Sequence, residues 1–307
     1  MTAVGFVAPF SQSVRHWNLQ ETKQRSLQRE RPRASGNPVW MLTMKRTLVV
    51  GGGGRLGRRV VRTLVEQQVP VLVAGRDPER AESAVRAYLR EVGLERQGDL
   101  AFVAHEITEP AAVQAEQVFR QNDVDVVIDV AGPSRLTPLE PYTVDYKGNR
   151  ELMRAASAGR GINHFILVTS LGTGRFGWPA ALLNLAYGIL FWKRRAELFL
   201  IDQVRRTAKR SPEGTESGGI RQFTIIRPAG LERATDNWGE THALQIRPAD
   251  SIFGGTVSRL QVAQVAVLAA LHPDASRNKI FELTTEQGVQ QIDPIQQMES
   301  VSAQVLS

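Results

Sequence analysis

The sequence predicts an α/β fold built on a doubly wound parallel sheet with helices on both faces. Short apolar runs alternate with segments of helical periodicity along most of the chain, which predicts parallel strands joined by crossover helices. Residues 45–81 also carry three glycines in the spacing GxxGxxG, between an apolar run and a helical pattern. A strand, a glycine turn, a helix and a second strand form the first half of a Rossmann-type, dinucleotide-binding fold.

The glycine turn consists of Gly51, Gly54 and Gly57, and a buried strand is predicted before it at residues 47–50. Leu56 opens the helical pattern and belongs to the same expected cofactor contact. A pyrophosphate binds bare backbone N–H groups at a helix N-terminus, and a Cβ at a close-approach glycine would hold it off. A glycine pattern alone is weak evidence, but its place between a strand and a helix favours a nucleotide site.

The following elements continue the alternation. A second strand is predicted at residues 69–74, and the helix after it begins where Asp77 provides an N-cap and Pro78 takes the first helical position. Further strands are predicted at residues 101–105, 124–130, 165–169, 223–226 and 279–283, and further helices at residues 111–122, 144–158 and 261–271. A polar loop is predicted between Gly230 and Ser251.

A strongly apolar stretch from Trp178 to Trp192 continues into a basic triplet at residues 193–195, and together they predict one long helix. The apolar part is shorter than the ~20 residues that span a bilayer, so it is not expected to cross a membrane. Two interpretations remain open. The helix packs beneath the sheet as part of the core, or its aromatic and basic side chains lie on a membrane surface.

The net charge of +7 is concentrated at one end of the chain. Residues 1–46 contain eight Lys and Arg against two Glu, which leaves a charge of +1 for all other residues. A basic nucleic-acid-binding face is therefore not expected. The absence of cysteine excludes thiolate catalysis and cysteine-ligated metals, and the five histidines show no metal-ligand spacing, so no metal site is expected.

Residues 1–44 are rich in Arg, Ser and Gln and contain few acids. This composition fits an organellar transit peptide, which is basic and poor in acidic residues. A disordered basic extension, or a translation start at Met41 or Met44, is the alternative. In either case the segment is set apart from residues 45–307, which are predicted to form a single NAD(P)-binding domain with a small C-terminal lobe for substrate or partner.

The end of the second strand indicates the cofactor. An NAD-selective protein places an acid there to accept hydrogen bonds from the ribose 2′-OH. Here the strand is followed at once by Arg76, whose planar guanidinium suits a 2′-phosphate, and Arg55 can reach that phosphate from the glycine turn. The nearby Asp77 is expected to act as an N-cap. NADP(H) is therefore favoured, with NAD(H) as the alternative.

Several motifs resemble those of the atypical short-chain dehydrogenase/reductases, namely the strand end VAGR, HFILVTSLGTG (164–174) and IIRPAGLE (225–232). Longer motifs are similar to one branch of that family, the dinucleotide-binding subunit of the protein translocon at the chloroplast inner envelope. They are FGWPAALLNLAYGILFWKRRAE (176–197), RPAGLERATDNWGETH (227–242) and SIFGGTVSRLQVA (251–263). The resemblance covers residues 45–285 and implies a plastid location, in the stroma or at the inner-envelope periphery, which favours a transit peptide.

The resemblance also implies roles for individual residues. Ser170 stands in the place of an active-site serine, and Lys193 matches the lysine that holds the nicotinamide ribose. The implied cofactor contacts are Gly51, Gly54 and Gly57 (pyrophosphate), Arg76 (2′-phosphate), Glu106 and Ile107 (adenine), Ala131 and Gly132 (adenosine ribose), and Pro228, Ala229 and Gly230 (nicotinamide).

One position departs from the family pattern. Catalytic relatives carry Tyr-x-x-x-Lys with the tyrosine as general acid, and the four-residue spacing sets both side chains on one helix face. Four residues before Lys193 this chain has Ile189, which cannot donate a proton, while Tyr187 is six residues before it and points elsewhere. The catalytic set is therefore incomplete, and a hydride route with another acid stays open.

Two functions follow. The first is a plastid protein that binds NADP(H) and has a redox-sensing or structural role in contact with a membrane or a translocon. The second is an NADP-dependent reductase of a small plastid substrate, positioned by Ser170 and Lys193.

Land-plant relatives carry C-terminal repeats that dock ferredoxin–NADP reductase. This sequence has no such repeats, so docking of that flavoenzyme through them is not expected.

Overall fold

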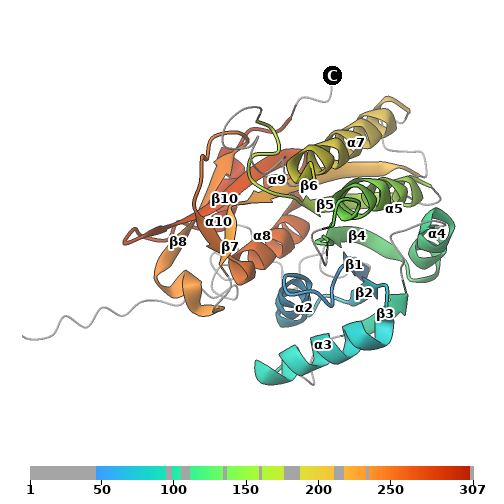
Figure 1. Cartoon of the computed structure of the whole chain (residues 1–307), viewed down its shortest axis with the longest axis horizontal. Coiled ribbons are helices and arrows are strands. Elements are labelled where there is room, and N and C mark those ends of the chain that lie inside the picture. Colours follow the sequence, from blue (N-terminus) through green and yellow to red (C-terminus); the bar gives the residue numbers. More distant parts are fainter. Residues whose placement is uncertain are drawn as a thin grey trace, which may run out of the picture.

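The structure, a computed structural model, describes residues 46–94, 99–104, 111–133, 137–158, 161–175, 187–210, 218–232 and 235–304, and of residues 111–115 the backbone alone. Its centre is an eight-stranded sheet with helices on both faces (Figure 1). The α/β fold predicted from the sequence is confirmed. The segment predicted as a transit peptide lies outside the described residues.

The sheet has the strand order β3-β2-β1-β4-β5-β6-β10-β8, and its neighbours pair in parallel except β10 and β8, which are antiparallel. The strands are β1 (Arg46–Val50), β2 (Val71–Gly75), β3 (Leu100–Ala104), β4 (Val124–Asp129), β5 (Ile162–Val168), β6 (Ile220–Pro228), β8 (His242–Pro248) and β10 (Lys279–Gln287). A separate parallel pair joins β7 (Gly230–Glu232) to β9 (Thr256–Ser258). The order of the first six strands is doubly wound, with its switch point between β1 and β4.

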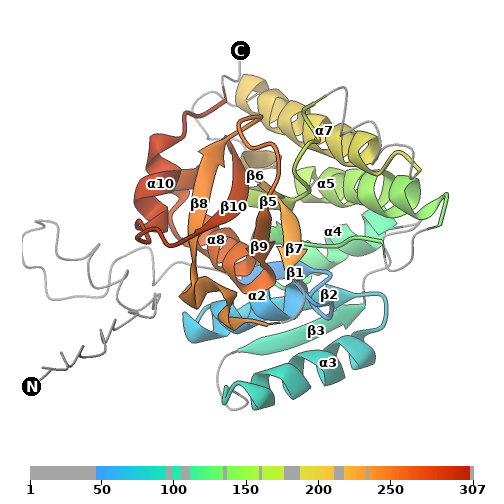
Figure 2. The ribbon, with the colours of Figure 1, turned by 60° about the vertical axis from the view of Figure 1, so that its left-hand side comes forward.

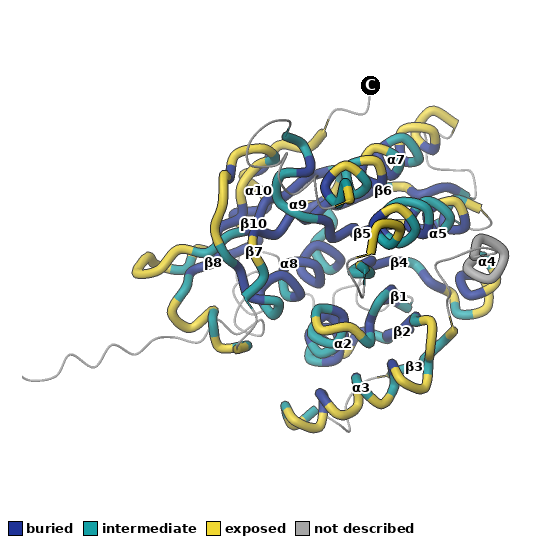
Figure 3. The backbone as a smooth tube through the Cα atoms, in the orientation of Figure 1, coloured by how far each residue is buried: buried dark blue, intermediate teal, exposed yellow. Residues whose placement is uncertain are grey.

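Each face of the sheet packs against its own group of helices (Figure 2). One group is α2 (Gly57–Glu66), α3 (Pro78–Glu91), α8 (Arg259–Leu271) and α10 (Pro294–Ser300); the other is α4 (Ala111–Gln121), α5 (Asn149–Ser157) and α7 (Ile189–Arg210). Three short helices complete the fold, namely η1 (Pro141–Gly148), η2 (Asn237–Glu240) and α9 (Pro273–Ser276). The central strands are buried between these layers, whereas the outer helix faces and the edge strand β3 are more exposed (Figure 3).

Alternation along β1 explains the two cores. Leu48 and Val50 are buried against one group of helices, and Val49 is buried against the other. Because successive side chains of a strand point to opposite faces, a strand covered on both faces is apolar throughout. The continuous apolar runs of the sequence therefore mark the central strands.

Side chains fix where several helices begin. The Asp77 carboxylate accepts a hydrogen bond from Arg80 N at 2.9 Å, and Pro78 takes the first helical position, as predicted. The single helix predicted from Trp178 onward is wrong, because Tyr187 and Gly188 have positive φ angles of 64° and 69° and α7 begins only at Ile189. Residues 176–186 of that stretch lie outside the described residues.

The polar loop predicted between Gly230 and Ser251 is also wrong, since it contains β8. Leu244 and Ile246 of this strand are buried, and their backbone N–H groups donate to the side-chain oxygens of Gln291 and Gln297 at 2.7 and 2.8 Å. Exposed sheet edges need such covering, since unpaired N–H and C=O groups invite other strands to add. The covering glutamines come from a distant segment, so no local pattern indicated a strand.

The helix predicted at residues 144–158 starts earlier, at Pro141, and its first part, η1, is a π-helix. Such π turns are rare and are often found at functional sites. Of the helices in the described ranges, none is long and apolar enough to cross a membrane. In the same part of the chain, no three His, Asp or Glu side chains gather as metal ligands would.

Candidate functional site

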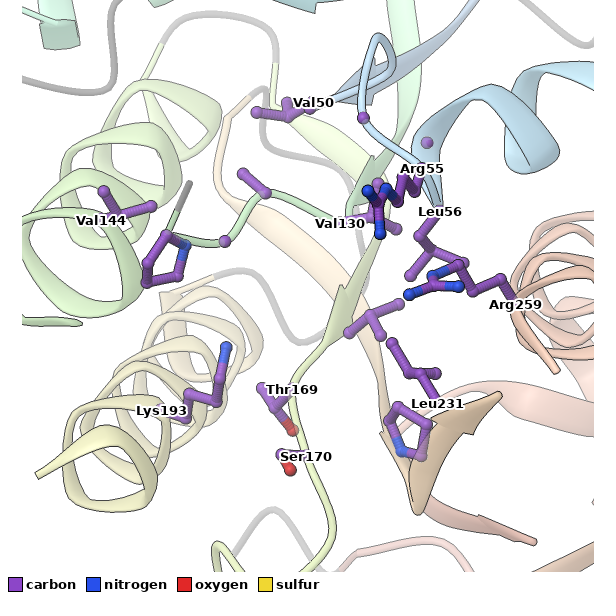
Figure 4. A pocket seen from close by; sticks show the side chains of 18 of the residues that line it. Val50, Arg55, Leu56, Val130, Val144, Thr169, Ser170, Lys193, Leu231 and Arg259 are labelled. Atoms are coloured by element: carbon purple, nitrogen blue, oxygen red, sulfur yellow. The ribbon is translucent and has the colours of Figure 1, made fainter. Parts of the chain in front are cut away.

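The carboxyl ends of β1, β2, β4, β5 and β6 open onto one pocket with a volume of about 1830 Å³. Figure 4 shows Arg55, Leu56 and Arg259 on one side of it and Lys193 and Val144 on the other. Doubly wound folds bind ligands at these strand ends. Small-molecule pockets typically measure ~300–1,000 Å³, so this one has room for an extended dinucleotide.

Most of the predicted site residues line this pocket. They are Gly51, Gly54, Arg55, Leu56, Gly57, Arg76, Ala131, Gly132, Ser170, Lys193, Pro228, Ala229 and Gly230. Glu106 and Ile107, the predicted adenine contacts, lie outside the described residues. Charged lining residues that the sequence did not single out are Arg80, Glu140, Arg175 and Arg259. The structure brings the set together, while the role of each residue stays a prediction.

The glycine turn is fixed by close packing of the chain on itself. Gly51 has a positive φ of 77°, and a Cβ there would stand 2.9 Å from Ala131 Cα. A Cβ on Gly57 would overlap Gly51 O and stand 2.5 Å from Gly52 Cα. Both glycines are therefore required by the fold, and their contact with a pyrophosphate stays a prediction. The turn leads into α2, whose N-terminus has no side-chain cap and suits a phosphate.

Three exposed arginines surround the end of β2 where it meets the pocket. Arg76 follows the strand directly, Arg55 comes from the glycine turn and Arg80 from the first turn of α3. Asp77, the acid among the lining residues at this end, uses its carboxylate to cap α3. This end of the pocket therefore presents guanidinium groups, which bind phosphate through paired, charge-assisted hydrogen bonds.

Lys193 is anchored in the pocket wall by a carboxylate that the sequence did not single out. Its Nζ donates to Asp145 Oδ1 at 2.7 Å, and Asp145, on the π-helix η1, is almost fully buried. Burial raises the pKa of Asp145, and the Lys193 ammonium opposes that rise. The two residues are 48 positions apart, so no local pattern pointed to the pair.

The hydroxyl groups lining the pocket, among the residues described, belong to Thr169 and Ser170 (Figure 4). Thr169 Oγ1 donates to the buried Glu197 at 2.7 Å, so it is committed to the wall. Ile189 is half-buried at the start of α7, and Tyr187 precedes the helix with an exposed side chain. No phenol therefore takes the place of the general acid in the described lining.

Asp129 ends β4 beneath the predicted ribose contact. Its Oδ1 accepts a hydrogen bond from Ala131 N at 2.9 Å, while its Oδ2 is buried and has no partner among the described residues. Burial raises the pKa of Asp129 to about 7; the Ala131 N–H and the Lys193 ammonium lower it, and Asp145 raises it. Asp129 thus holds the backbone of the pocket wall in place and titrates near neutrality.

We expect Asp129 to make the stability of the protein depend on pH. Its pKa lies near ~3.9 in the unfolded chain, so the folded state retains a proton that the unfolded state loses. Its contribution is then fully present below pH ~4, declines as the pH rises towards 7, and is lost above that. Asp129→Asn keeps the acceptor for Ala131 N but cannot ionise.

Urea unfolding of both proteins at pH 5 and pH 8 tests this. Relative to the wild type, Asp129→Asn should gain on the order of 2 kcal/mol in unfolding free energy between pH 5 and pH 8. A difference between the two proteins that is the same at both pH values would contradict the assignment.

Comparison with known proteins places the chain in a family. Residues 51–273 match the model of a family described as NAD(P)H-binding. The chain belongs to this family. This NAD(P)H-binding chain is 36% identical over 244 residues to Protein TIC 62, chloroplastic, of Pisum sativum. The aligned residues cover 78% of this chain and 42% of that protein. It is 34% identical over 261 residues to the protein of the same name from Oryza sativa subsp. japonica, covering 82% and 49%.

The chain spans less than half the length of these relatives. The predicted resemblance to the atypical short-chain dehydrogenase/reductases, and to their chloroplast branch, is confirmed, and so is the plastid location. A transit peptide and the inner envelope stay predictions.

Solved structures show the same fold. The oxidoreductase ylbE from Lactococcus lactis superposes with a TM-score of 0.57 at 20% identity, covering 83% of this chain and 95% of that one. Gre2 of Candida albicans, in complex with NADPH, superposes with a TM-score of 0.53 at 17% identity, covering 78% of each chain. At such identities the similarity shows the fold alone.

Proposed function

We propose that this NAD(P)H-binding chain prefers NADP(H) and acts as a redox-responsive or structural component in contact with a plastid membrane or translocon. The observation that carries the proposal is a well-formed dinucleotide pocket beside a catalytic set without a phenolic acid. The resemblance to TIC 62 supports the place of action.

The residues of the pocket fit an NADP(H) molecule from end to end. The turn from Gly51 to Gly57 would hold the pyrophosphate, Arg76 and Arg55 the 2′-phosphate, and Lys193 the nicotinamide ribose. NADPH supplies a hydride when it is bound. The chain's own contribution is to position the cofactor and to hold the Lys193 ammonium beside it through the ion pair with Asp145.

A redox response requires a route from the pocket to the surface, and two elements provide it. On α7, Lys193 lines the pocket, while the neighbouring Phe191 has 48% of its side chain exposed. On η1, Asp145 binds Lys193, while Tyr142 contacts Trp192 with ring centroids 4.8 Å apart. We call the group formed by Tyr142, Phe191 and Trp192 the outer aromatic surface. A movement of Lys193 that depends on the redox state of the cofactor would therefore shift this surface.

That outer surface is suited to a membrane or a protein partner. The Tyr146 and Trp192 rings stack with centroids 5.6 Å apart, and the Arg195 guanidinium lies 5.7 Å from the Tyr146 centroid. Aromatic and basic side chains together are typical of interfacial contacts. The described part of this helix combines the two interpretations. Leu190 packs in the core, whereas Phe191 is exposed and available to a membrane or a partner.

Reduction of a small plastid substrate is the second candidate. Ser170 and Lys193 line the same pocket, as in a reductase, and the pocket is large enough to hold more than a cofactor. The missing phenol stands against the usual mechanism, so this candidate needs another proton donor.

Hydrogen exchange of the full chain with saturating NADPH or NADP⁺ tests the first proposal. We expect η1 and the first turns of α7 to differ in protection between the two states, and binding to vesicles of phosphatidylglycerol and phosphatidylcholine to differ in parallel. Identical protection and identical vesicle binding would contradict a redox response.

NADPH oxidation with a panel of aldehydes and ketones tests the second candidate. We expect no oxidation that depends on these compounds. Oxidation that is abolished in Lys193→Ala, with an unchanged melting temperature, would establish a reductase instead.

A further inference from the structure

One end of the pocket lies beyond the predicted nicotinamide contacts and is lined by two loops. The first is the turn after β5, residues 171–175, and the second is the loop at residues 252–255. Of the lining residues from Val168 onward, the charged ones are Arg175, Lys193 and Arg259, and no carboxylate is among them. The charged side chains that line this half of the pocket are therefore all cationic.

Each of these three cations has a partner in the protein, and two of them form hydrogen bonds. Lys193 is paired with Asp145, and Arg259 donates to the backbone carbonyl of Glu232 at 2.8 Å. In Figure 4 Arg259 lies on the same side of the pocket as Arg55 and Leu56, the side expected for the phosphates. Arg175 is the cation that belongs to the far end alone.

The Arg175 guanidinium contacts an aromatic ring and a carboxylate, but one of its nitrogen donors forms no hydrogen bond among the described residues. Its Cζ lies over the Phe253 ring, 4.0 Å from the ring centroid, which is a cation–π contact. Its Nη2 is buried and has no hydrogen-bond partner among the described residues. The side chain as a whole is 21% exposed and lines the pocket, so a ligand would meet its accessible part rather than Nη2.

The carboxylate paired with Arg175 does not supply a hydrogen-bond acceptor for Nη2. Glu282 Oε2 forms an ion pair with Arg175 Nη2 at 4.0 Å, which is beyond hydrogen-bond distance. The Glu282 oxygens instead accept three backbone N–H groups, from Asp250, Ser251 and Ile252, at 2.8–3.0 Å. Glu282 thereby builds the loop that carries Phe253, and Phe253 in turn contacts the guanidinium.

We propose that the end of the pocket around Arg175 binds the anionic group of a small second ligand, a carboxylate or a phosphate monoester. The guanidinium carries a permanent positive charge and several N–H donors, which suit the oxygens of either group. Leu231, Ile252 and Phe253 line the same end, so the ligand carries an apolar body beside its anion. This inference rests on the proposed function, because it assigns the rest of the pocket to the dinucleotide.

Calorimetric titration of the full chain, saturated with NADP⁺ so that the cofactor's phosphate sites are filled, tests the inference. The probes are benzoate for a carboxylate, phenyl phosphate for a phosphate monoester, and benzamide as a neutral compound of the same shape. We expect one or both anions to bind at least tenfold more tightly than benzamide. The tighter of the two anions identifies the group.

Substitutions then locate the site. Arg175→Gln should weaken anion binding on the order of tenfold to a hundredfold, since hydrogen bonds to charged groups contribute ~1.5–3 kcal/mol. Arg175→Lys should recover part of this affinity, because it keeps the charge but not the planar fork. Phe253→Ala, at a side chain that is 82% exposed, should weaken binding without affecting folding. Arg206→Gln, at an exposed arginine on α7, is the matched control and should bind like the wild type.

The outcomes separate the two proposals. Equal binding of the anions and benzamide, or wild-type anion binding in Arg175→Gln, would overturn the inference while leaving the cofactor assignment intact. Failure of the wild type to bind NADP⁺ at all would instead overturn the proposed function. A fall in NADP⁺ affinity of Arg175→Gln equal to its fall in anion affinity would show that Arg175 serves the cofactor.

Discussion

Arg76→Ala is expected to weaken NADPH binding on the order of tenfold to a hundredfold and to leave NADH binding nearly unchanged. The two nucleotides differ in the 2′-phosphate of the adenosine ribose. Arg76 follows β2 directly, and in doubly wound folds this ribose lies close to the end of that strand. The substitution removes charge-assisted hydrogen bonds to that phosphate, which NADH does not carry. Calorimetric titration of the wild type and the variant with both nucleotides measures the effect.

The control and the neighbours make this experiment specific. Arg206→Ala removes an exposed arginine on α7, far from the pocket lining, and should change neither affinity. Arg55→Ala and the double substitution show whether the two arginines share one phosphate, since shared partners give non-additive effects. An equal decrease for NADPH and NADH would mean that Arg76 contacts the common part of the cofactor, and no decrease would assign the specificity elsewhere.

The sequence was informative where local chemistry determines structure. Strands buried on both faces require continuous apolar runs, which located β1, β2, β4, β5 and β6. The glycine spacing located the turn, because Gly51 and Gly57 have no room for a side chain. Asp77 and Pro78 marked the start of α3 because an N-cap acts within one turn. Each of these signals depends on residues close together in the chain.

The sequence was uninformative where a residue depends on distant partners. Asp145, Glu197 and Arg227 carry charges, so sequence alone would place them in solvent, yet all three are buried. Apart from Arg194, three positions before Glu197, the partners named here lie 23 to 48 positions away, and the sheet topology brings them together. The edge strand β8 was missed for the same reason, since its partner β10 and its covering glutamines come later in the chain.

Arg227→Met is expected to destabilise the protein by ~3–5 kcal/mol, the cost of leaving a buried charge without its partner. Arg227 is fully buried and binds Glu197 through two hydrogen bonds, Nε to Oε1 at 3.0 Å and Nη2 to Oε2 at 2.7 Å. Its Nη1 also donates to Asp250 at 3.1 Å. Urea unfolding measures the decrease in unfolding free energy.

The hydrogen bonds around Glu197 connect Arg227 to the pocket, so the loss of Arg227 should also disturb the residues at the end of β5. Glu197 Oε1 also accepts hydrogen bonds from Thr169 and Thr173, at 2.7 and 2.8 Å, and these residues flank Ser170 at the end of β5. Arg206→Met, at an exposed pair with Asp202, is the matched control and should cost under ~1 kcal/mol.

The double variant Arg227→Met, Glu197→Gln removes both charges, so it should be more stable than the sum of the two single effects predicts. If Arg227→Met alone cost less than ~1 kcal/mol, Arg194, which donates to Glu197 Oε2 at 3.1 Å, would have to compensate the carboxylate by itself. The Arg227–Glu197 pair would then position Thr169 and Thr173 beside the pocket rather than stabilise the fold.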